Sequence, residues 1–408
     1  MKKKKIPIFF TIWLALSMVF LLNPLGAVPQ KTSSPFSQAK FVPDIALIVD
    51  FSYAYRNVNN EEFQTMALPG FSLTGIDEGF AGRGFNLNYA ELTISAVVDP
   101  YFDLFTCFHL SEGEFEIEEA YVRTRSLPLG FQLKAGQFLS SFGRLNSQHD
   151  HYWNFSDQPL IYRGIFGESN LDEKGVQLNW VAPLGIFLQL GVEYLKGENE
   201  ASFGTTGFQI GEYNIEEANS HLWVAFAKTS LDFERLILLG GISFASGKYR
   251  WFQAESAYGI AGTSRLWGGD LTLKYLIDSY RYISLQGEYI HRKVDARKYS
   301  DSVVDPITPG QSGLYLEWIW RFNRRWRWGA RYDLIFEKEA GGGEPLFAVP
   351  DHLYRCSSML EYNPTEFSRI RLQYNYDRSR YPAGEPAEIH EVFFQINLSI
   401  GAHGAHPF

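Results

Sequence analysis

The chain has 408 residues, of which 16% are aromatic and 20% charged, and its formal net charge is −9. Its mean hydropathy is slightly negative, which excludes a bundle of membrane-spanning helices. We expect no nucleic-acid partner for a chain of this acidity. No composition shift or linker divides the sequence, so we expect a single large domain after the N-terminal segment.

The N-terminus has the pattern of an export signal. Four lysines at positions 2–5 precede the apolar run IPIFFTIWLALSMVFLL, and the small residues of NPLGA follow it. The run is short for a membrane anchor and ends at a small-residue cleavage site, so we predict a signal peptide over residues 1–27. A short polar segment, 28–43, precedes the first strand. No later stretch reaches the roughly 20 apolar residues that a spanning helix needs.

Segments in which apolar and polar residues alternate follow one another along the rest of the chain. This period of two is typical of strands with one apolar face. The pattern predicts sixteen strands, near 44–56, 84–98, 102–111, 115–126, 129–138, 174–182, 185–195, 219–229, 234–246, 264–277, 280–292, 312–322, 324–336, 352–362, 366–377 and 389–400.

The connections alternate between short turns and mostly long loops. Turns such as DPYFD, SLPLG and NPTEF carry the residues of tight turns. An even strand number with this alternation is typical of an outer-membrane barrel, with turns in the periplasm and loops outside. The loop-side connections around Gly113 and at 378–388 are short, and we expect long loops at 57–83, 139–173, 196–218, 247–263, 293–311 and 337–351.

The faces of the strands indicate which side meets lipid. In RRWRWGARYDL (324–334), arginines alternate with Trp326, Trp328 and Tyr332. A backbone in lipid must satisfy all its hydrogen bonds within the protein, which for strands means a closed sheet. We therefore predict an all-β fold over 44–408: a 16-stranded antiparallel transmembrane β-barrel with apolar residues on lipid and polar residues around a water-filled lumen.

Three segments fit this pattern less well. LWVAFAK and LILLGGISF are apolar on both faces, and in EFEIEEAYVRTR the alternation breaks between Glu118 and Glu119, which predicts a bulge or a later strand start. The alternative fold is a large soluble β-sandwich or propeller, which does not account for the alternating connections. No nucleophile elbow or phosphate-binding glycine loop is present, so we expect no enzyme, no catalytic residue and no cofactor.

The segment LKAGQFLSSFGRLNSQHDHYWNFSDQPLIYRGIFG (133–167) resembles the third-loop region of Gram-negative porins, in particular those of the phosphate-selective porin O and P superfamily. FEIEEAYVRTRSLPLGFQLKAGQF (115–138) and the closing GAHGAHPF add to the resemblance. It implies a sixteen-stranded barrel, often a homotrimer, with the third loop (139–173) folded into the pore. It implies a constriction built from Gly143, Arg144, Gln148, His149, Asp150, His151, Asp157 and Arg163. Because no loop is rich in lysine, phosphate selectivity is not carried over.

Cationic residues are expected on the lumen face of the wall, namely Lys134, Arg325, Arg327, Arg331, Arg355, Arg369 and Arg371. Free guanidinium groups would favour anions in the pore. Alternatively, these arginines pair with Glu317, Asp333, Glu361 and Asp377 and only solvate the wall. His149 and His151 would hold Zn²⁺ if a third ligand approached, but the sequence identifies none, so no metal site is assigned.

The sequence thus predicts an outer-membrane porin for passive diffusion of small hydrophilic solutes or ions through a charged constriction, with a mild anion preference. The alternatives are a receptor or a metal- or anion-binding barrel closed by the inward loop, and a structural outer-membrane protein. The expected partners are the lipid bilayer, lipopolysaccharide, small hydrophilic solutes, the barrel-assembly machinery, which would read the terminal Phe408, and further copies of the chain in a homotrimer. Cys107 and Cys356 lie in distant strands, so no disulfide is expected.

Overall fold

The structure is a computed structural model that describes residues 42–66, 81–111, 114–167, 170–199, 201–253, 258–301, 303–339, 353–380 and 386–401. The predicted signal peptide (1–27), nearly all of the polar segment after it, and Phe408 lie outside these residues. The residues from Pro43 onward form one compact unit.

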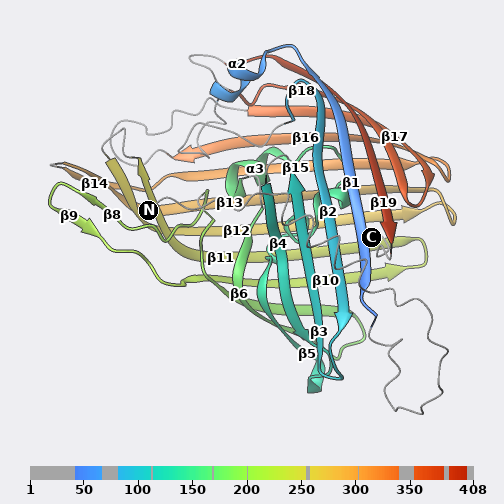
Figure 1. Cartoon of the computed structure of the whole chain (residues 1–408), viewed down its shortest axis with the longest axis horizontal. Coiled ribbons are helices and arrows are strands. Elements are labelled where there is room, and N and C mark those ends of the chain that lie inside the picture. Colours follow the sequence, from blue (N-terminus) through green and yellow to red (C-terminus); the bar gives the residue numbers. More distant parts are fainter. Residues whose placement is uncertain are drawn as a thin grey trace, which may run out of the picture. The chain divides into compact units, whose positions relative to one another are not determined.

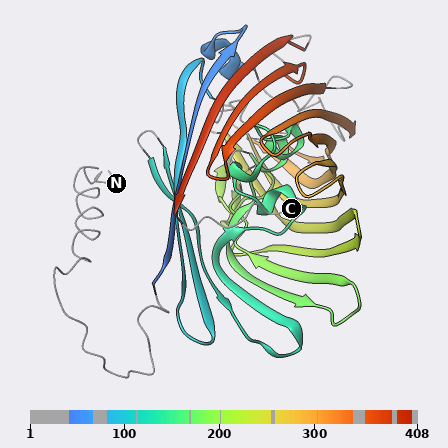
Figure 2. The same cartoon turned by 90° about the vertical axis from the view of Figure 1, so that its right-hand side faces the viewer.

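The described residues form an antiparallel sheet of seventeen strands, of which sixteen make a closed ring (Figures 1 and 2). The ring closes because β1 pairs with both β2 and β19. All sixteen predicted strands are present, and all but β11, β12 and β13 end within a few residues of their predicted ends. They are β1 (Asp44–Arg56), β2 (Gly84–Val97), β3 (Phe102–Ser111), β4 (Glu114–Thr124), β5 (Phe131–Leu139), β6 (Asp172–Val181), β7 (Phe187–Leu195), β10 (Leu222–Phe233), β11 (Leu236–Gln253), β12 (Tyr258–Leu276), β13 (Tyr282–Ser300), β15 (Gly310–Arg321), β16 (Trp326–Glu339), β17 (Leu353–Thr365), β18 (Ser368–Asp377) and β19 (Ile389–Gly401).

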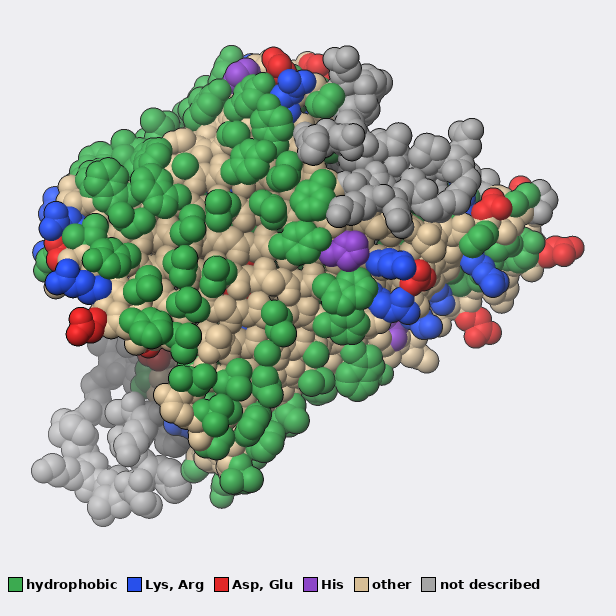
Figure 3. Space-filling model, turned by 180° about the vertical axis from the view of Figure 1, so that it is seen from behind, with side chains coloured by type: hydrophobic (Ala, Val, Ile, Leu, Met, Phe, Trp, Pro, Cys, Tyr) green, Lys and Arg blue, Asp and Glu red, His purple; other side chains and the backbone are tan. Residues whose placement is uncertain are grey.

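Alternation along each strand separates a polar inner face from an apolar outer face. In β16, Arg331 and Asp333 are 3% and 0% exposed inside the ring, whereas Tyr332 between them is 41% exposed outside it. Hydrophobic side chains cover the outer wall in Figure 3, and charged side chains gather toward its edges. An inside-out sheet of this kind suits lipid outside and water or polar groups inside.

The predicted irregularity in β4 is a β-bulge. Cys107 of β3 lies opposite Glu119, and the next residue of β3, Phe108, lies opposite Ile117, so Glu118 is the extra residue. A bulge lets two consecutive side chains leave the regular alternation. Glu118 and Glu119 both contact His149 inside the ring as a result.

Two of the predicted long loops are strand extensions instead. β11 and β12 pair from Leu236 with Tyr275 to Gln253 with Tyr258, which leaves only 254–257 of the expected loop 247–263. β13 likewise continues to Ser300 and pairs there with the short β14 (Val304–Ile307). A separate hairpin, β8 (Phe208–Ile210) and β9 (Tyr213–Ile215), packs on these extensions, and the apolar contacts with Ala261 stabilise them beyond the ring.

The helices are short. α2 (Asn60–Thr65) follows β1, η2 (Pro128–Gly130) lies in a turn, and η3 (Leu145–Ser147), η4 (Asp150–Tyr152) and α3 (Leu160–Phe166) all belong to the connection between β5 and β6. Among the described residues, no helix is long and apolar enough to cross a membrane. Below, "turn edge" means the edge of the ring that carries connections such as 98–101 and 322–325, and "loop edge" means the opposite one.

Candidate functional site: a loop fastened across the lumen

The connection between β5 and β6, residues 140–171, is the candidate functional site. We call its described part the inner loop. It lies inside the ring, as the green helical turns in Figure 2 show, and it corresponds to the predicted constriction loop 139–173. Its apolar side chains are buried, among them Phe142, Phe155, Leu160 and Ile161, each at most 1% exposed.

The inner loop packs on an apolar patch of the inner wall. α3 and Phe142 share one buried cluster with wall residues of β10 to β17, including Val224, Ala245 and Ile290. This explains why LWVAFAK is apolar on both faces: Trp223 is exposed on the outside, whereas Leu222 and Val224 lie in this cluster. In LILLGGISF, Ile242 and Phe244 are exposed on the outside, whereas Ile237 and Leu239 line a cavity inside the ring. Each fully buried aliphatic side chain contributes about 1.5–3 kcal/mol, so the apolar patch holds α3 against the wall.

Asp157 joins the inner loop to the arginines of β16 and β17. Its carboxylate lies 2.9 Å from Nη2 of Arg331 and 2.8 Å from Nη1 of Arg355. Gln373 and Asn375 of β18 donate further hydrogen bonds to it. Burial alone would raise the pKa of Asp157, but the two guanidinium groups overcome this effect and lower the pKa to about 2. Asp157 is therefore an anchor carboxylate at neutral pH.

A second anchor surrounds Glu361 of β17. Arg327 binds both carboxylate oxygens, at 2.6 and 2.7 Å, and Arg371 binds one of them at 2.9 Å. The same two arginines reach the inner loop, because Arg327 donates to Oδ1 of Asn154 and Arg371 donates to the carbonyl of Trp153. Asp333 in turn accepts hydrogen bonds from Arg331, Arg355 and the backbone N–H of Leu160.

Two wall carboxylates hold the inner loop by its backbone. Glu288 of β13 accepts from the N–H groups of Arg144 and Leu145 and from the hydroxyl of Tyr162. Glu193 of β7 accepts from the hydroxyl of Ser140 and the N–H of Ser141. These two carboxylates were not predicted from the sequence, because their partners are backbone groups that no side-chain pattern marks. Their only signal is a charged residue at a lumen-facing position in the middle of an apolar strand.

The two histidines of the inner loop meet carboxylates of β2 and β4. His149 lies between Glu118, 3.2 Å from Nδ1, and Glu119, 2.9 Å from Nε2. His151 Nδ1 lies 3.0 Å from Glu91. Burial alone would lower the pKa of His149, but Glu118 and Glu91 raise it well above its ordinary value. These residues fasten the inner loop to the side of the ring facing the β13 anchor (Figure 1).

The remaining predicted site residues take different positions. Arg144 donates to Gln286 and lines a cavity together with Gln148. Asp150 is half-buried beside the histidines, where desolvation and the nearby Glu118 and Glu91 raise its pKa well above its ordinary value. Arg163 is half-buried on α3.

Two predicted wall cations lie apart from the arginine anchors. Lys134 lies over the rings of Phe138 and Tyr121. Arg325 is exposed in the turn before β16, next to the hydroxyl of Tyr362. The other predicted wall residues, Arg327, Arg331, Arg355, Arg369 and Arg371, do lie on the inner face and lie close to carboxylates.

A cavity of about 310 Å³ lies between the inner loop and the turn edge. Arg144, Gln148, Tyr152 and Asn154 of the inner loop line it on one side, and turn residues line it on the other. The charged residues around it are five cations, Arg144, Lys274, Arg321, Arg327 and Arg369, and three carboxylates, Asp278, Glu361 and Glu366. Two of the carboxylates are paired, Glu361 as described and Asp278 with Arg281 at 2.6 Å. Cations therefore outnumber carboxylates in the lining of the cavity.

A closed sixteen-stranded barrel with an inward loop defines a class, the porin-type barrels. The outer membrane channel DcaP of Acinetobacter baumannii shares this fold, with a TM-score of 0.55 at 12% identity over 89% of this chain and 99% of that one. OmpT of Vibrio cholerae in its trimer form has a TM-score of 0.54 at 11% identity over 88% and 99%. The anion-selective porin from Comamonas acidovorans has a TM-score of 0.53 at 11% identity over 88% and 100%.

The chain belongs to the same family as an uncharacterised protein of Aquifex aeolicus (strain VF5). The two are 48% identical over 384 residues, which are 92% of this chain and 82% of the relative. No protein-family model matches the sequence. The solved structures are too distant in sequence to establish more than the fold.

Proposed function

We propose that this protein is an outer-membrane porin through which small hydrophilic solutes or ions diffuse passively, with a mild preference for anions. The inside-out distribution of polar and apolar residues supports placement in a bilayer. The observation that carries the proposal is the cavity below the inner loop, which has five cations against three carboxylates in its lining. A solute on this path meets an excess of guanidinium and ammonium groups, which raises the local concentration of anions.

The test is the current through purified protein in a planar bilayer under a salt gradient. The reversal potential should show that anions permeate more readily than cations. Arg321→Gln should reduce this preference, because Arg321 lines the cavity. Within the part of the chain that the structure describes, Arg321 forms no ion pair with a carboxylate. Arg123→Gln is the matched control: Arg123 pairs with Asp103 near the turn edge and does not line the cavity. A wild-type channel that prefers cations would refute the anion preference.

A second candidate is a binding protein on the same scaffold, in which the inner loop closes the lumen. The apolar cluster between α3 and the wall favours it, because a dry contact of that kind excludes water from part of the ring. Single-channel recording separates the two. A porin gives open steps as the wild type, whereas a closed binder conducts only after the inner loop is removed.

We further propose the outer membrane as the location, with lipopolysaccharide and lipid against the apolar outer wall, and insertion by the barrel-assembly machinery through the C-terminal segment ending at Phe408. We also propose a homotrimer, for which the trimer form of Vibrio cholerae OmpT is the precedent. Membership of the phosphate-selective porin O and P superfamily remains a proposal that rests on residues 115–167. Light scattering of the purified protein with a detergent correction would give the number of chains, and a single chain per particle would contradict the trimer. We propose no catalytic step and no cofactor for transport.

A further inference from the structure

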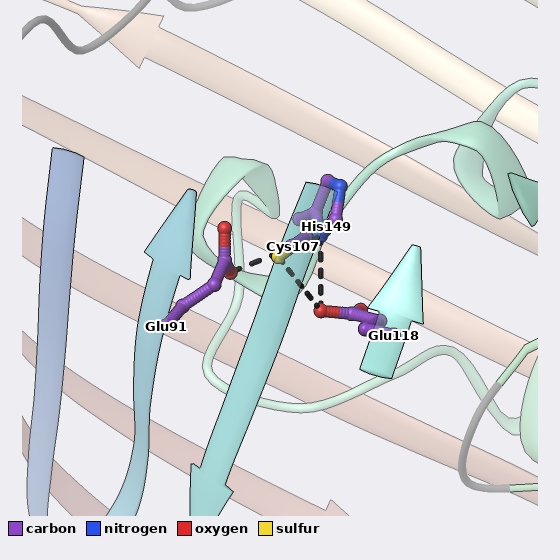
Figure 4. A group of neighbouring side chains, drawn as sticks. All are labelled: Glu91, Cys107, Glu118 and His149. Atoms are coloured by element: carbon purple, nitrogen blue, oxygen red, sulfur yellow. Dashed lines mark hydrogen bonds and ion pairs between the residues drawn. The ribbon is translucent and has the colours of Figure 1, made fainter. Parts of the chain in front are cut away.

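We propose that the inner loop completes a four-coordinate Zn²⁺ site inside the barrel, formed by His149 of the loop and by Glu91, Cys107 and Glu118 of three adjacent strands (Figure 4). Each residue offers one ligand atom, and all four atoms lie within 4.8 Å of one another. The set contains one nitrogen, one sulfur and two carboxylate oxygens. Because β2, β3 and β4 are hydrogen-bonded neighbours, the wall presents its three ligands on one small area of its inner face.

The spacing of the ligand atoms suits a tetrahedral ion. With Zn–S near 2.3 Å and Zn–N and Zn–O near 2.0–2.2 Å, the edges of such a tetrahedron are roughly 3.3–3.6 Å. Nδ1 of His149 lies 3.2 Å from Oε2 of Glu118 and 3.8 Å from Oε2 of Glu91. Sγ of Cys107 lies 3.5 Å from Oε2 of Glu118 and 4.0 Å from Nδ1 of His149. Movements of a few tenths of an ångström would bring these four distances to the tetrahedral edge, and the other two ligand pairs lie within 4.8 Å.

A carboxylate oxygen of Glu91 that has no hydrogen-bond partner supports the presence of a bound ion. Glu91 is 3% exposed, and its Oε1 has no hydrogen-bond partner among the described residues. An oxygen left without a partner at a buried site destabilises the folded protein. An ion would satisfy Oε1 if the carboxylate turned to coordinate through it and left Oε2 to His151. The bulge in β4 is a further supporting feature, because it turns Glu118 inward in addition to Glu119.

The residues around the four ligands hold them in the orientation that a metal needs. Nε2 of His149 lies 2.9 Å from Glu119, so Nδ1 is directed at the other ligands. Glu119 also accepts the N–H of Leu139, which fixes its carboxylate. His151 hydrogen-bonds to Glu91 through Nδ1 at 3.0 Å. A carboxylate behind a metal-binding histidine is the usual support of zinc sites, and its loss typically weakens binding 10–100-fold.

The donor set selects the metal. A thiolate and an imidazole are ligands for zinc and other borderline or soft metals, whereas Ca²⁺ and Mg²⁺ require oxygen. A site with four protein ligands leaves no position for a reacting water, so it is structural in type. Binding requires the thiolate of Cys107 and the neutral imidazole of His149, so an ion entering the site replaces the protons on these groups. The side chain of Glu118 is 23% exposed and marks the side from which an ion enters.

The competing explanation is that His149 is only an ion-pair anchor for the inner loop. It accounts for Glu118 and Glu119, but not for the placement of Cys107, which is fully buried among these charged groups on the inner face. Cys356, by contrast, is exposed. It is therefore a matched control for any effect of a thiol.

The test uses the purified full-length protein, freed of metal with a chelator, kept reduced and titrated with Co²⁺. One equivalent should give the visible spectrum of tetrahedral cobalt together with a thiolate-to-cobalt charge-transfer band, and Zn²⁺ should abolish both. Cys107→Ser should lose the charge-transfer band, Cys356→Ser should keep it, and Glu119→Gln should bind Co²⁺ 10–100-fold more weakly. Circular dichroism of each variant checks that the sheet is formed.

A wild-type protein that binds no Co²⁺ with a thiolate band overturns the proposal, and so does a band that persists in Cys107→Ser. His149→Ala covers the case in which Cys107→Ser fails to fold, because it leaves the three wall ligands in place; it should weaken Co²⁺ binding at least tenfold, and an unchanged affinity overturns the proposal. The site does not depend on what passes through the barrel. Conductance tests the proposed function, and the cobalt spectrum tests only the metal site.

Discussion

Replacing Asp157 with asparagine removes one negative charge from between Arg331 and Arg355 while keeping the shape of the side chain. The amide that takes the place of the carboxylate would also direct N–H groups toward neighbours that are themselves donors, including the guanidinium of Arg355 at 2.8 Å. The inner loop should therefore loosen at its contact with β16 and β17. The apolar cluster and the anchors at Glu288 and Glu193 would still hold the rest of the loop.

The magnitude follows from the pKa of Asp157. The ordinary value is 3.8 and the value in the folded protein is about 2, and the side chain is buried, so the charge contributes about 2 kcal/mol to this contact at neutral pH. Because 1.36 kcal/mol is a tenfold change, the population with this end of the loop detached should rise about thirtyfold. Truncation to alanine should cost more, about 3–5 kcal/mol, because it leaves two buried arginines with one partner fewer.

The assay is single-channel recording in planar bilayers. Asp157→Asn should spend about thirty times more of its time in higher-conductance or noisier states than the wild type. Asp103→Asn is the matched control, since Asp103 pairs with Arg123 and Arg125 away from the inner loop. Equal open-state statistics in the wild type and in Asp157→Asn would refute the anchoring role of Asp157.

The dependence on pH has a definite sign. The pKa of Asp157 is lowered in the folded protein, so its stabilisation is complete above about pH 4 and disappears as the pH falls toward 2. The difference between the wild type and Asp157→Asn should therefore be constant from neutral pH down to about 4 and should vanish near 2. A difference that disappears already between pH 7 and 5 would contradict this assignment.

Further predictions concern the wall and the loop. Leu372→Arg places a charge on the outer face of β18, where Leu372 is 51% exposed, and should reduce the free energy of unfolding from bilayers by about 2–4 kcal/mol, measured by urea titration in lipid vesicles. Ser284→Arg adds the same charge beside the cavity and should cost much less; an equal loss would contradict the orientation of the wall. Gly143→Ala should weaken the Glu288 anchor, because residue 143 has φ of +64° and a Cβ would collide with Glu288 and Tyr162. Its signature is faster proteolysis of the inner loop than in the wild type, and unchanged cleavage would exclude this explanation.

The strands were predictable because lipid and lumen impose a period of two that a single sequence displays. Even the bulge at Glu118 was visible as a break in the alternation. The predicted ends of β11 to β13 were less accurate. Their extension depends on contacts with the hairpin β8–β9, which is distant in the sequence, and no local pattern in the sequence reveals these contacts. The inward position of the inner loop came from the resemblance to porins and not from its composition.

The chemistry of the site was less predictable. Arg331 and Arg355 were placed on the inner wall, but their partner Asp157 lies some 170 to 200 residues earlier in the chain, and no local pattern reveals which carboxylate reaches them. The histidines His149 and His151 were recognised as metal-type residues without a third ligand. Glu91, Cys107 and Glu118 come from three other strands, and the inward fold of the loop brings His149 to them.

The inner loop has a mechanical consequence as well. It is attached by ion pairs to β2 and β4, and by hydrogen bonds to Glu288 of β13 and Glu317 of β15, which lie nearly opposite in the ring. An empty barrel deforms readily under lateral pressure, whereas a segment attached to opposite walls resists this deformation. The inner loop should therefore stiffen the barrel against the lateral pressure of the surrounding acyl chains. Removing its contacts on either side should make the barrel easier to deform.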